Sequence, residues 1–451
     1  MDMDRTALTA LYLDEIRRRG LRASDLLGDL PELKPYEYQG RFLSRPLFLG
    51  YSERRQLYAD IENVQTALLS LPDRLYDGDF TAFAHAAGAY GPAAAVQTGQ
   101  NKPTRLARAD LYAGTAGFQL LELNQGSPIG GADNIDMGRA LLRHPVLAGF
   151  AHAHGLACVD TLRNHIDTLF AETGLDPGSS PVVALTGWPT WFEKVRDPYL
   201  EAVALDWQLL GIDTHACHLG ELSRSRGRVW FGGRPVDVIF RTFPIGLLSE
   251  SSQAPAMLAQ LQDAAARGEV KLCSSVDTDI FTSKAALAMI SDDANRHLFT
   301  PAERESIDRI VPWTRLVRHG PVTVPDGSRA DLLEYAMAHQ DELILKPSMG
   351  TKGIGIIPGW KDLSPQQWRA YVTGASDPWY VIQQRVRPEP ELFPDENGEL
   401  IPWSPVWGLF TGSAGYSGVY VRAVMDPDVG VINHALGAFS GSCLAAGPPA
   451  A

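Results

Sequence analysis

Apolar residues recur with helical spacing through much of the first 100 residues of the chain. In RTALTALYLDEI (5–16) and RRQLYADIENVQTALLSL (54–71) they return every three or four positions, which predicts two amphipathic helices. Two strand-like runs follow, KPTRLARADLYA and GFQLLELNQ, and the GTAG between them predicts a hairpin turn. The next stretch, 131–155, has the pattern of a single helix.

Strand and helix patterns alternate from residue 181 onward. PVVALTG and IDTHACHL are typical of buried strands, DPYLEAVALDWQLLG lies between them as a helix, and RVWFGGRPVDVIFRTFP predicts a hairpin that leads into another strand. Such alternation favours a small, mainly parallel sheet covered by helices. Helices are predicted over 254–316 and mostly strands over 343–439, whereas the small residues of SGSCLAAGPPAA (440–451) predict a frayed end.

Composition sets limits on the partners of the protein. The chain has 451 residues, of which 45% are hydrophobic and 21% charged, enough for two or three domains. Its net charge of −13 disfavours nucleic acid and anionic membranes as partners, although a local pocket can still be basic. The four cysteines form no CxxC pair, and neither a signal peptide nor an apolar run of transmembrane length is visible. We therefore expect a soluble, cytoplasmic protein.

The stretch LILKPSMGTKGIGIIPG (343–359) combines a strand, a lysine and three closely spaced glycines. Lys346 at the strand end is a fixed positive charge, and Gly350, Gly353 and Gly355 allow a tight loop whose backbone N–H groups can face an anion. The pattern matches neither the P-loop nor the Rossmann fingerprint, so a plain β-turn remains the alternative. About 30 residues later, WYVIQQRV ends in a polar pair, Gln383 and Gln384, which could bind a base or ribose.

Carboxylates on the predicted hairpin suggest a metal site. Glu122 and Asn124 are two residues apart and therefore share a face, on which Asp110 and Arg108 from the partner strand can converge. Two carboxylates and an amide oxygen suit Mg²⁺ bound to nucleotide phosphates. The alternative is a charged outer face without metal, but Glu122 interrupts the apolar LLEL, where a polar group is costly without a partner.

Together these motifs resemble the ATP-grasp ligases. The acidic residue followed by Glu-x-Asn is similar to their metal motif, and LILKPSMGTKGIGI with VIQQRV is similar to their phosphate loop and adenine-side strand. In the ordinary family the lysine loop comes first, whereas here Glu-x-Asn precedes it. The order resembles the circularly permuted, glutathionylspermidine-synthetase-like group, over roughly residues 100–440. FTSKAALAMI places Lys284 at the position of that group's second nucleotide lysine.

The resemblance implies an α+β or α/β chain with a circularly permuted ATP-grasp fold and a small Rossmann-like pre-ATP-grasp domain. Residues 1–175 would hold the helical region and the metal-binding strands, 176–275 the Rossmann-like domain, and 276–451 the nucleotide-binding part. The implied reaction joins a carboxylate to an amine through an acyl phosphate, with release of ADP and phosphate. The glycine loop would close over the phosphates and exclude water.

Individual roles follow from the same resemblance. Asp110, Glu122 and Asn124 would hold Mg²⁺, with two ions expected. Arg108 would stabilise the transferring phosphoryl group and Ser127 would contact the acceptor. Arg422 and Arg241 could each bind a substrate carboxylate or form a surface salt bridge, and the loop 186–193 could recognise substrate or fill the core. ATP would contact Lys284, Lys346, Ser348, Gly350, Thr351, Lys352, Gly353, Gly355, Gln383 and Gln384.

Three functions remain open on the sequence. The chain could be a ligase for a peptide or amino-acid natural product, a polyamine–peptide ligase, or a nucleotide-binding scaffold without chemistry. The expected partners are a small-molecule carboxylate and amine, with no nucleic acid and no membrane, and a homodimer is an open alternative. Nothing in the sequence chooses the substrates.

Overall fold

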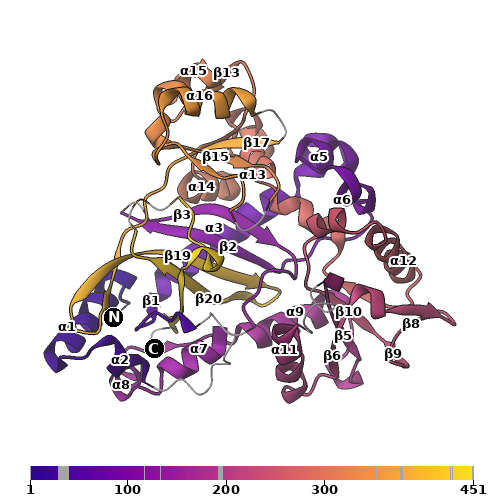
Figure 1. The fold of residues 1–451 in the computed structure, drawn as a ribbon, viewed down its shortest axis with the longest axis horizontal. Coiled ribbons are helices and arrows are strands. Elements are labelled where there is room, and N and C mark those ends of the chain that lie inside the picture. Colours follow the sequence, from indigo (N-terminus) through magenta and orange to yellow (C-terminus); the bar gives the residue numbers. More distant parts are fainter. Residues whose placement is uncertain are drawn as a thin grey trace.

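The fold is known from a computed structural model (Figure 1). It describes residues 2–28, 40–115, 117–132, 134–190, 197–350, 353–375, 379–426, 428 and 430–448.

The two ends of the chain build one sheet at the centre of the molecule. Within the described residues it has eight strands, and its main path runs β1-β21-β20-β19-β2-β3 (Figure 1). Two short strands, β18 and β4, pair with β19 and β21 outside that path. The strands are β1 (Leu47–Leu49), β2 (Ala107–Gly114), β3 (Gly117–Gln125), β4 (Leu156–Ala157), β18 (Glu391–Pro394), β19 (Leu400–Gly412), β20 (Gly415–Val424) and β21 (Phe439–Ala446).

Both faces of the central sheet are buried. Leu47 and Leu49 of β1 pack into the core that contains α3 (Tyr51–Leu69) and α14 (Pro301–Ile310). Phe48, between them, points to the opposite face, where it joins a second core. That second core is covered by α1 (Arg5–Arg19), α2 (Ala23–Leu27), α7 (Asn134–Leu141) and α8 (Pro145–Ala153). Alternation along the strand thus supplies both cores.

A separate sheet of four strands, all parallel, is formed by the middle of the chain as described. Its order is β11-β10-β5-β6, with β5 (Val183–Gly187), β6 (Thr214–His218), β10 (Val238–Arg241) and β11 (Lys271–Cys273). Helices α9 (Thr161–Thr173) and α11 (Pro198–Leu209) pack on one face and α12 (Ala254–Ala266) on the other. Strand order reverses between β5 and β10, the position at which open parallel sheets bind ligands beyond their carboxyl ends.

A smaller lobe lies at the top of Figure 1. Its sheet has the order β12-β17-β15-β16, with β12 (Thr314–Leu316), β15 (Leu343–Pro347), β16 (Ile357–Pro358) and β17 (Tyr380–Gln384). Helices α15 (Leu332–Ala338) and α16 (Pro365–Gly374) contribute to its core. α13 (Lys284–Ser291) joins this lobe to the rest of the chain.

The remaining elements are short, and their strands form two small sheets of their own. They are α4 (Leu71–Tyr76), α5 (Phe80–Ala86), α6 (Gly91–Val96), β7 (Ser223–Ser225), β8 (Arg228–Phe231), β9 (Arg234–Val236), β13 (Pro321–Thr323) and β14 (Arg329–Asp331). The 3-10 helices are η2 (Pro177–Ser179), η3 (Leu219–Glu221), η4 (Ile245–Glu250), η5 (Val276–Thr282), η6 (Asp293–Leu298), η7 (Gln340–Glu342) and η8 (His434–Leu436).

The mixed α/β class, the early helices, the hairpin and the parallel sheet are confirmed. Several element predictions are wrong. Residues 131–155 form two helices, because Pro145 begins the second and His144 before it is extended. The range 254–316, predicted as helical, also contains the strands β11 and β12. The predicted frayed end contains β21, whose Cys443 and Leu444 are fully buried. The circular permutation, the Rossmann-like domain and the domain boundaries stay predictions.

Among the described residues, every helix is too short or too polar to cross a membrane.

Burial of β21 predicts a large stability effect near the end of the chain. Leu444→Asp places a carboxylate in a fully buried position, and we expect it to unfold the protein or to lower the free energy of unfolding by more than about 4 kcal/mol. Leu436→Asp is the matched control, because Leu436 is 66% exposed and should tolerate the change. Circular dichroism during urea unfolding checks both; equal stability of the two variants would contradict a buried β21.

Candidate active site

The β2–β3 hairpin brings four polar side chains to one cavity. Arg108 lies opposite Asn124 and Asp110 lies opposite Glu122 in the antiparallel register, and all four line the cavity. The register shifts directly after Asp110, where β3 carries an extra residue, Leu121. The predicted convergence of these side chains is therefore found in the structure.

The buried carboxylate of Asp110 is held by two arginines. Arg108 donates from Nε to Oδ1 at 2.9 Å and from Nη2 to Oδ2 at 3.3 Å. Arg422 of β20 places Nη2 2.9 Å from the same Oδ1, an ion pair without good hydrogen-bond alignment. Burial raises the pKa of Asp110, but the two guanidiniums outweigh it and lower the pKa to about 2. Arg422 thus forms a buried pair and not the surface salt bridge considered above.

Glu122 is paired with a lysine that begins a helix. Ser283 caps α13 by accepting from the N–H of Ala285, which fixes Lys284 at the first helical position. Lys284 Nζ lies 2.9 Å from Glu122 Oε2. Burial raises the pKa of Glu122, but the charge and hydrogen bond of Lys284, together with the charge of Lys346, outweigh it, so the net pKa is lowered.

Lys346, on β15, enters the cavity from the small lobe. Its Nζ donates to Gln383 Oε1 at 2.6 Å and lies 3.4 Å from the Leu121 carbonyl oxygen. Gln383 in turn donates to Thr314 Oγ1 at 3.0 Å. Burial lowers the pKa of Lys346 to about 8, and the attraction of Glu122 only partly opposes it. The lysine is thus held in place while its charge is only partly compensated.

These side chains line a cavity of about 360 Å³ between the small lobe and the central sheet. Its described charged lining consists of four cations and two anions, a net charge of +2 when all are ionised. The four cations are Arg108, Lys284, Lys346 and Arg422, and the anions are Asp110 and Glu122. The cavity is therefore suited to an anionic ligand, inside a protein whose overall charge is −13.

The glycine loop forms one wall of this cavity. Gly350 and Gly353 line it, and Gly353 and Gly355 have φ of 75° and 76°, which side chains rarely adopt. A Cβ on Gly353 would lie 2.6 Å from Val431 Cγ1, so the loop approaches the segment 430–433 closely. Ser348 is buried, and its carbonyl oxygen accepts from the N–H of Lys284 at 2.8 Å. Thr351 and Lys352 lie outside the described residues.

Segment 430–433 is a part of the cavity that the sequence did not indicate. Gly430, Val431, Ile432 and Asn433 line it, although 430–439 was predicted as a strand. Only η8 and irregular backbone precede β21 there. The turn-forming DPDVG just before it was the available signal.

The hard oxygen donors for a cation are present. Asn124 Nδ2 lies 3.4 Å from Asp110 Oδ2 and 3.5 Å from Glu122 Oε1, so its amide faces both carboxylates. A half-turn of the amide would direct its oxygen toward the same point. The described residues contain no group of three His, Cys, Asp or Glu side chains placed for a metal. Two carboxylates and an amide fit an ion that takes its other ligands from phosphates and water, as Mg²⁺ does.

Three of the predicted contact residues do not line this cavity. Gln383 and Gln384 do not act as a pair, because adjacent residues of a strand face opposite sides: Gln383 is buried against Lys346, and Gln384 is exposed. Ser127 lies beside the cavity rather than in it, and its hydroxyl donates to the Arg241 carbonyl oxygen and meets Ser274 Oγ at 3.0 Å. Its predicted contact with the acceptor finds no support in this placement.

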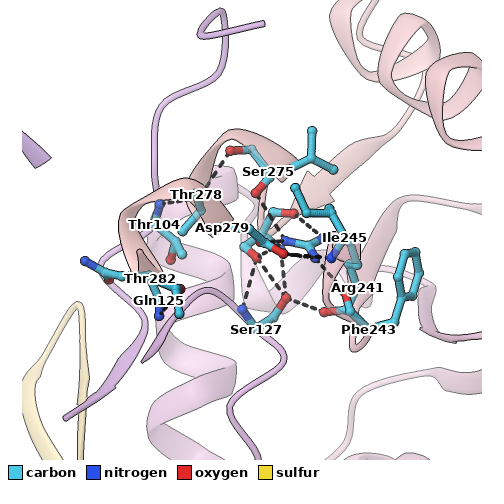
Figure 2. Close-up of polar contacts among 12 residues, drawn as sticks. Thr104, Gln125, Ser127, Arg241, Phe243, Ile245, Ser275, Thr278, Asp279 and Thr282 are labelled. Atoms are coloured by element: carbon cyan, nitrogen blue, oxygen red, sulfur yellow. Dashed lines mark hydrogen bonds and ion pairs between the residues drawn. The ribbon is translucent and has the colours of Figure 1, made fainter. Parts of the chain in front are cut away.

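Arg241 is a structural residue of the parallel sheet. Figure 2 shows its guanidinium against the Asp279 carboxylate, with Nη1 3.0 Å from Oδ2. Nη1 also donates to the Phe243 carbonyl oxygen at 2.6 Å, and Asp279 Oδ2 accepts from the N–H of Ile245 at 3.0 Å. Arg241 is only 1% exposed, so the surface salt bridge is wrong and a direct substrate contact is unsupported. Of the loop 186–193, Trp188 fills the core, and 191–193 lie outside the described residues.

Comparison with solved structures finds a likeness over nearly the whole chain. A glutathione synthetase-like effector from Globodera pallida matches with a TM-score of 0.56 and 14% identity, over 98% of this chain and 97% of that one. A candidate gamma-glutamylcysteine synthetase from Methylobacillus flagellatus KT matches with a TM-score of 0.45 and 13% identity, over 84% and 88% of the two chains. No family model and no curated protein matches. The first likeness establishes a shared fold and nothing finer.

The depressed pKa of Lys346 generates a stability prediction. Its folded pKa of about 8 lies below the unfolded value near 10.4, so the folded state binds fewer protons between these values. The destabilising effect of the buried charge is therefore full below pH 8 and fades as pH rises toward 10. We expect Lys346→Met to be at least as stable as the wild type at pH 7. That advantage should shrink by up to about 1.4 kcal/mol per pH unit above pH 8.

Urea unfolding at pH 7, 8, 9 and 10 measures this difference. Lys271→Met is the matched control, because Lys271 is exposed and its ammonium stays in water in both states. If the difference in free energy of unfolding between Lys346→Met and the wild type does not change with pH, the pKa of Lys346 is not lowered by burial as inferred.

Proposed function

We propose that the protein is an ATP-dependent carboxylate–amine ligase that forms an amide bond and releases ADP and phosphate. The observation that carries the proposal is the excess of buried positive charge around Asp110, Glu122 and Asn124. Phosphates need such cations, and a nucleotide-bound Mg²⁺ needs those oxygen donors. The fold shared with the glutathione synthetase-like effector supports the same class of enzyme, as does the order of the sequence motifs.

In the proposed reaction a substrate carboxylate takes the terminal phosphoryl group of ATP, which gives an acyl phosphate and ADP. An amine then attacks the acyl carbon, phosphate leaves, and the amine loses a proton. Lys284 and Lys346 bind phosphate oxygens, because both ammonium groups line the cavity. Arg108 is anchored at Asp110 and at the Ile129 carbonyl oxygen, 2.6 Å from Nη1, so it presents a fixed positive charge to the transferring group.

Magnesium fits the donor set of Asp110, Glu122 and Asn124, and when bound it would supply charge neutralisation to the phosphates. Asp110 and Glu122 would then contact the metal ion as well as the cationic side chains with which they pair in the structure. Arg108, Arg422 and Lys284 hold both carboxylates in the cavity meanwhile, at distances near 2.9 Å. The protein thus keeps the ligands oriented by its own cations.

A scaffold that binds nucleotide without chemistry is the weaker reading. A binding function alone would not require two carboxylates in the cavity, which reduce its affinity for phosphate. Both carboxylates are nonetheless present and held in register by the hairpin. Their retention favours a catalytic site.

The products distinguish this reaction from other uses of ATP. With Mg²⁺ and a productive pair of carboxylate and amine, we expect one ADP and one phosphate for each amide formed. AMP and pyrophosphate in stoichiometric amounts would overturn the proposed acyl phosphate. Anion-exchange chromatography of the nucleotides, with mass spectrometry of the amide, measures both across a panel of substrate pairs.

Loss of one oxygen donor should abolish turnover without unfolding the protein. We expect Asn124→Ala and Glu122→Gln each to reduce the rate at least 100-fold, because several kcal/mol of charge stabilisation would be lost. Asn124→Ala leaves no buried charge unpaired and is the cleaner variant. Glu305→Gln is the matched control, because Glu305 is exposed on α14. A near-native rate in folded Asn124→Ala would place the metal elsewhere.

A further inference from the structure

A second cavity, of about 350 Å³, adjoins the charged one. The two share five lining residues: Asn124, Pro128, Pro244, Leu247 and Gly350. A group in the second cavity would therefore lie directly beside the metal-ligand candidate Asn124 and the glycine loop. Its volume is within the range of small-molecule sites.

The lining of this second cavity is mostly apolar. Tyr90 and Ala93 come from the start of α6, Ile245 and Leu247 from η4, and Met349 from the glycine loop. Tyr90 is 63% exposed and packs edge-to-face on Trp379 of the small lobe, with ring centroids 4.9 Å apart. Aromatic and aliphatic side chains from three parts of the fold thus surround a space next to the proposed reaction centre.

The negative charge in this lining is neutralised by a neighbouring arginine. Asp279 is the one charged residue among the described residues that line the cavity, and the buried guanidinium of Arg241 neutralises it. The same carboxylate accepts from the N–H of Ile245 and so fixes the start of η4, which forms part of the wall (Figure 2). Arg241 is thus a positioning residue: it shapes the wall through Asp279 and leaves no free charge for a ligand.

We propose that this second cavity binds an uncharged, largely apolar group of one of the two substrates, such as the side chain of a leucine-like or phenylalanine-like compound. The inference rests on the proposed ligase function and adds the substrate class to it. A polyamine is disfavoured, because its ammonium groups would lose water without gaining a carboxylate in this cavity and would meet a net charge of +2 in the next. A single methylene group gained or lost in an apolar pocket changes discrimination between substrates by about 10- to 200-fold.

Filling the cavity tests the inference. Ala93→Trp places a large side chain on a residue that lines it, and Ala95→Trp makes the same change on an exposed residue of the same helix that does not. We expect Ala93→Trp to reduce kcat/KM for apolar substrates at least 10-fold, and Ala95→Trp to leave it unchanged. Binding of a non-hydrolysable ATP analogue with Mg²⁺ should be the same in both variants. It therefore also reports whether Ala93→Trp is folded.

A binding assay separates failure of this inference from failure of the proposed function. Saturation-transfer NMR with L-leucine, L-phenylalanine, 3-phenylpropionate, L-aspartate and spermidine needs no turnover. Saturation of the apolar probes that Ala93→Trp removes and Ala95→Trp keeps would support the cavity even if no pair yields ADP. ADP formation only with aspartate-like compounds or spermidine would overturn the inference and leave the ligase intact. Absence of apolar probe binding to the wild type, with and without the ATP analogue, would also overturn it.

Should Ala93→Trp fail to fold, Tyr90→Glu provides the same test from the exposed rim. It adds a negative charge at the entrance without disturbing the core, because Tyr90 is mostly exposed. Apolar probes should then bind at least 10-fold more weakly. Unchanged binding of every apolar probe in folded Tyr90→Glu would contradict the assignment of this cavity.

Discussion

Two guanidinium groups from different strands of the central sheet meet on the buried carboxylate of Asp110. Arg108 lies two residues away on β2, and Arg422 comes from β20, with β19 between the two strands. Arg422 is buried and Arg108 is partly buried, so both arginines depend on that carboxylate, just as the carboxylate depends on them. The cavity can therefore hold a cluster of cations only because the central sheet fixes their counter-charges in register.

One short segment relates this cluster to the other parts of the fold. Within η5, Asp279 pairs with Arg241 of the parallel sheet, and Thr282 Oγ1 accepts from the N–H of Gln125 at 3.0 Å at the end of the hairpin (Figure 2). Two residues later Lys284 reaches Glu122. The hairpin, the parallel sheet and the lysine are thus positioned by one stretch of about ten residues, which places the charged and apolar cavities side by side.

Features set by neighbouring residues in the sequence could be predicted, whereas features set by contacts between distant parts of the chain could not. The shared face of Glu122 and Asn124 is a local consequence of strand alternation and was predicted. The same rule places Gln383 and Gln384 on opposite sides of β17, the first buried and the second exposed. The partner of Arg241 lies 38 residues away, and nothing local indicates that this arginine is buried. β21 was mistaken for a frayed end because its small residues lack strand character. They are small because the sheet is tightly covered there: a Cβ on Gly441 of β21 would lie 2.9 Å from Leu43 Cδ1.

The unfavourable burial of like charges in the charged cavity indicates which ligand it binds. Burial lowers the pKa of Lys346, and the nearby charge of Lys284 adds to that lowering, so the protonated form of Lys346 is disfavoured. An anion that enters would oppose both effects on Lys346, because its negative charge attracts the ammonium group and offsets the repulsion from Lys284. Part of the binding free energy for a polyphosphate would therefore come from relief of unfavourable interactions already present in the free protein. A neutral or cationic occupant would gain nothing of the kind. The charged cavity thus selects for the anion, and the neutral wall beside it is free to select for shape and hydrophobicity.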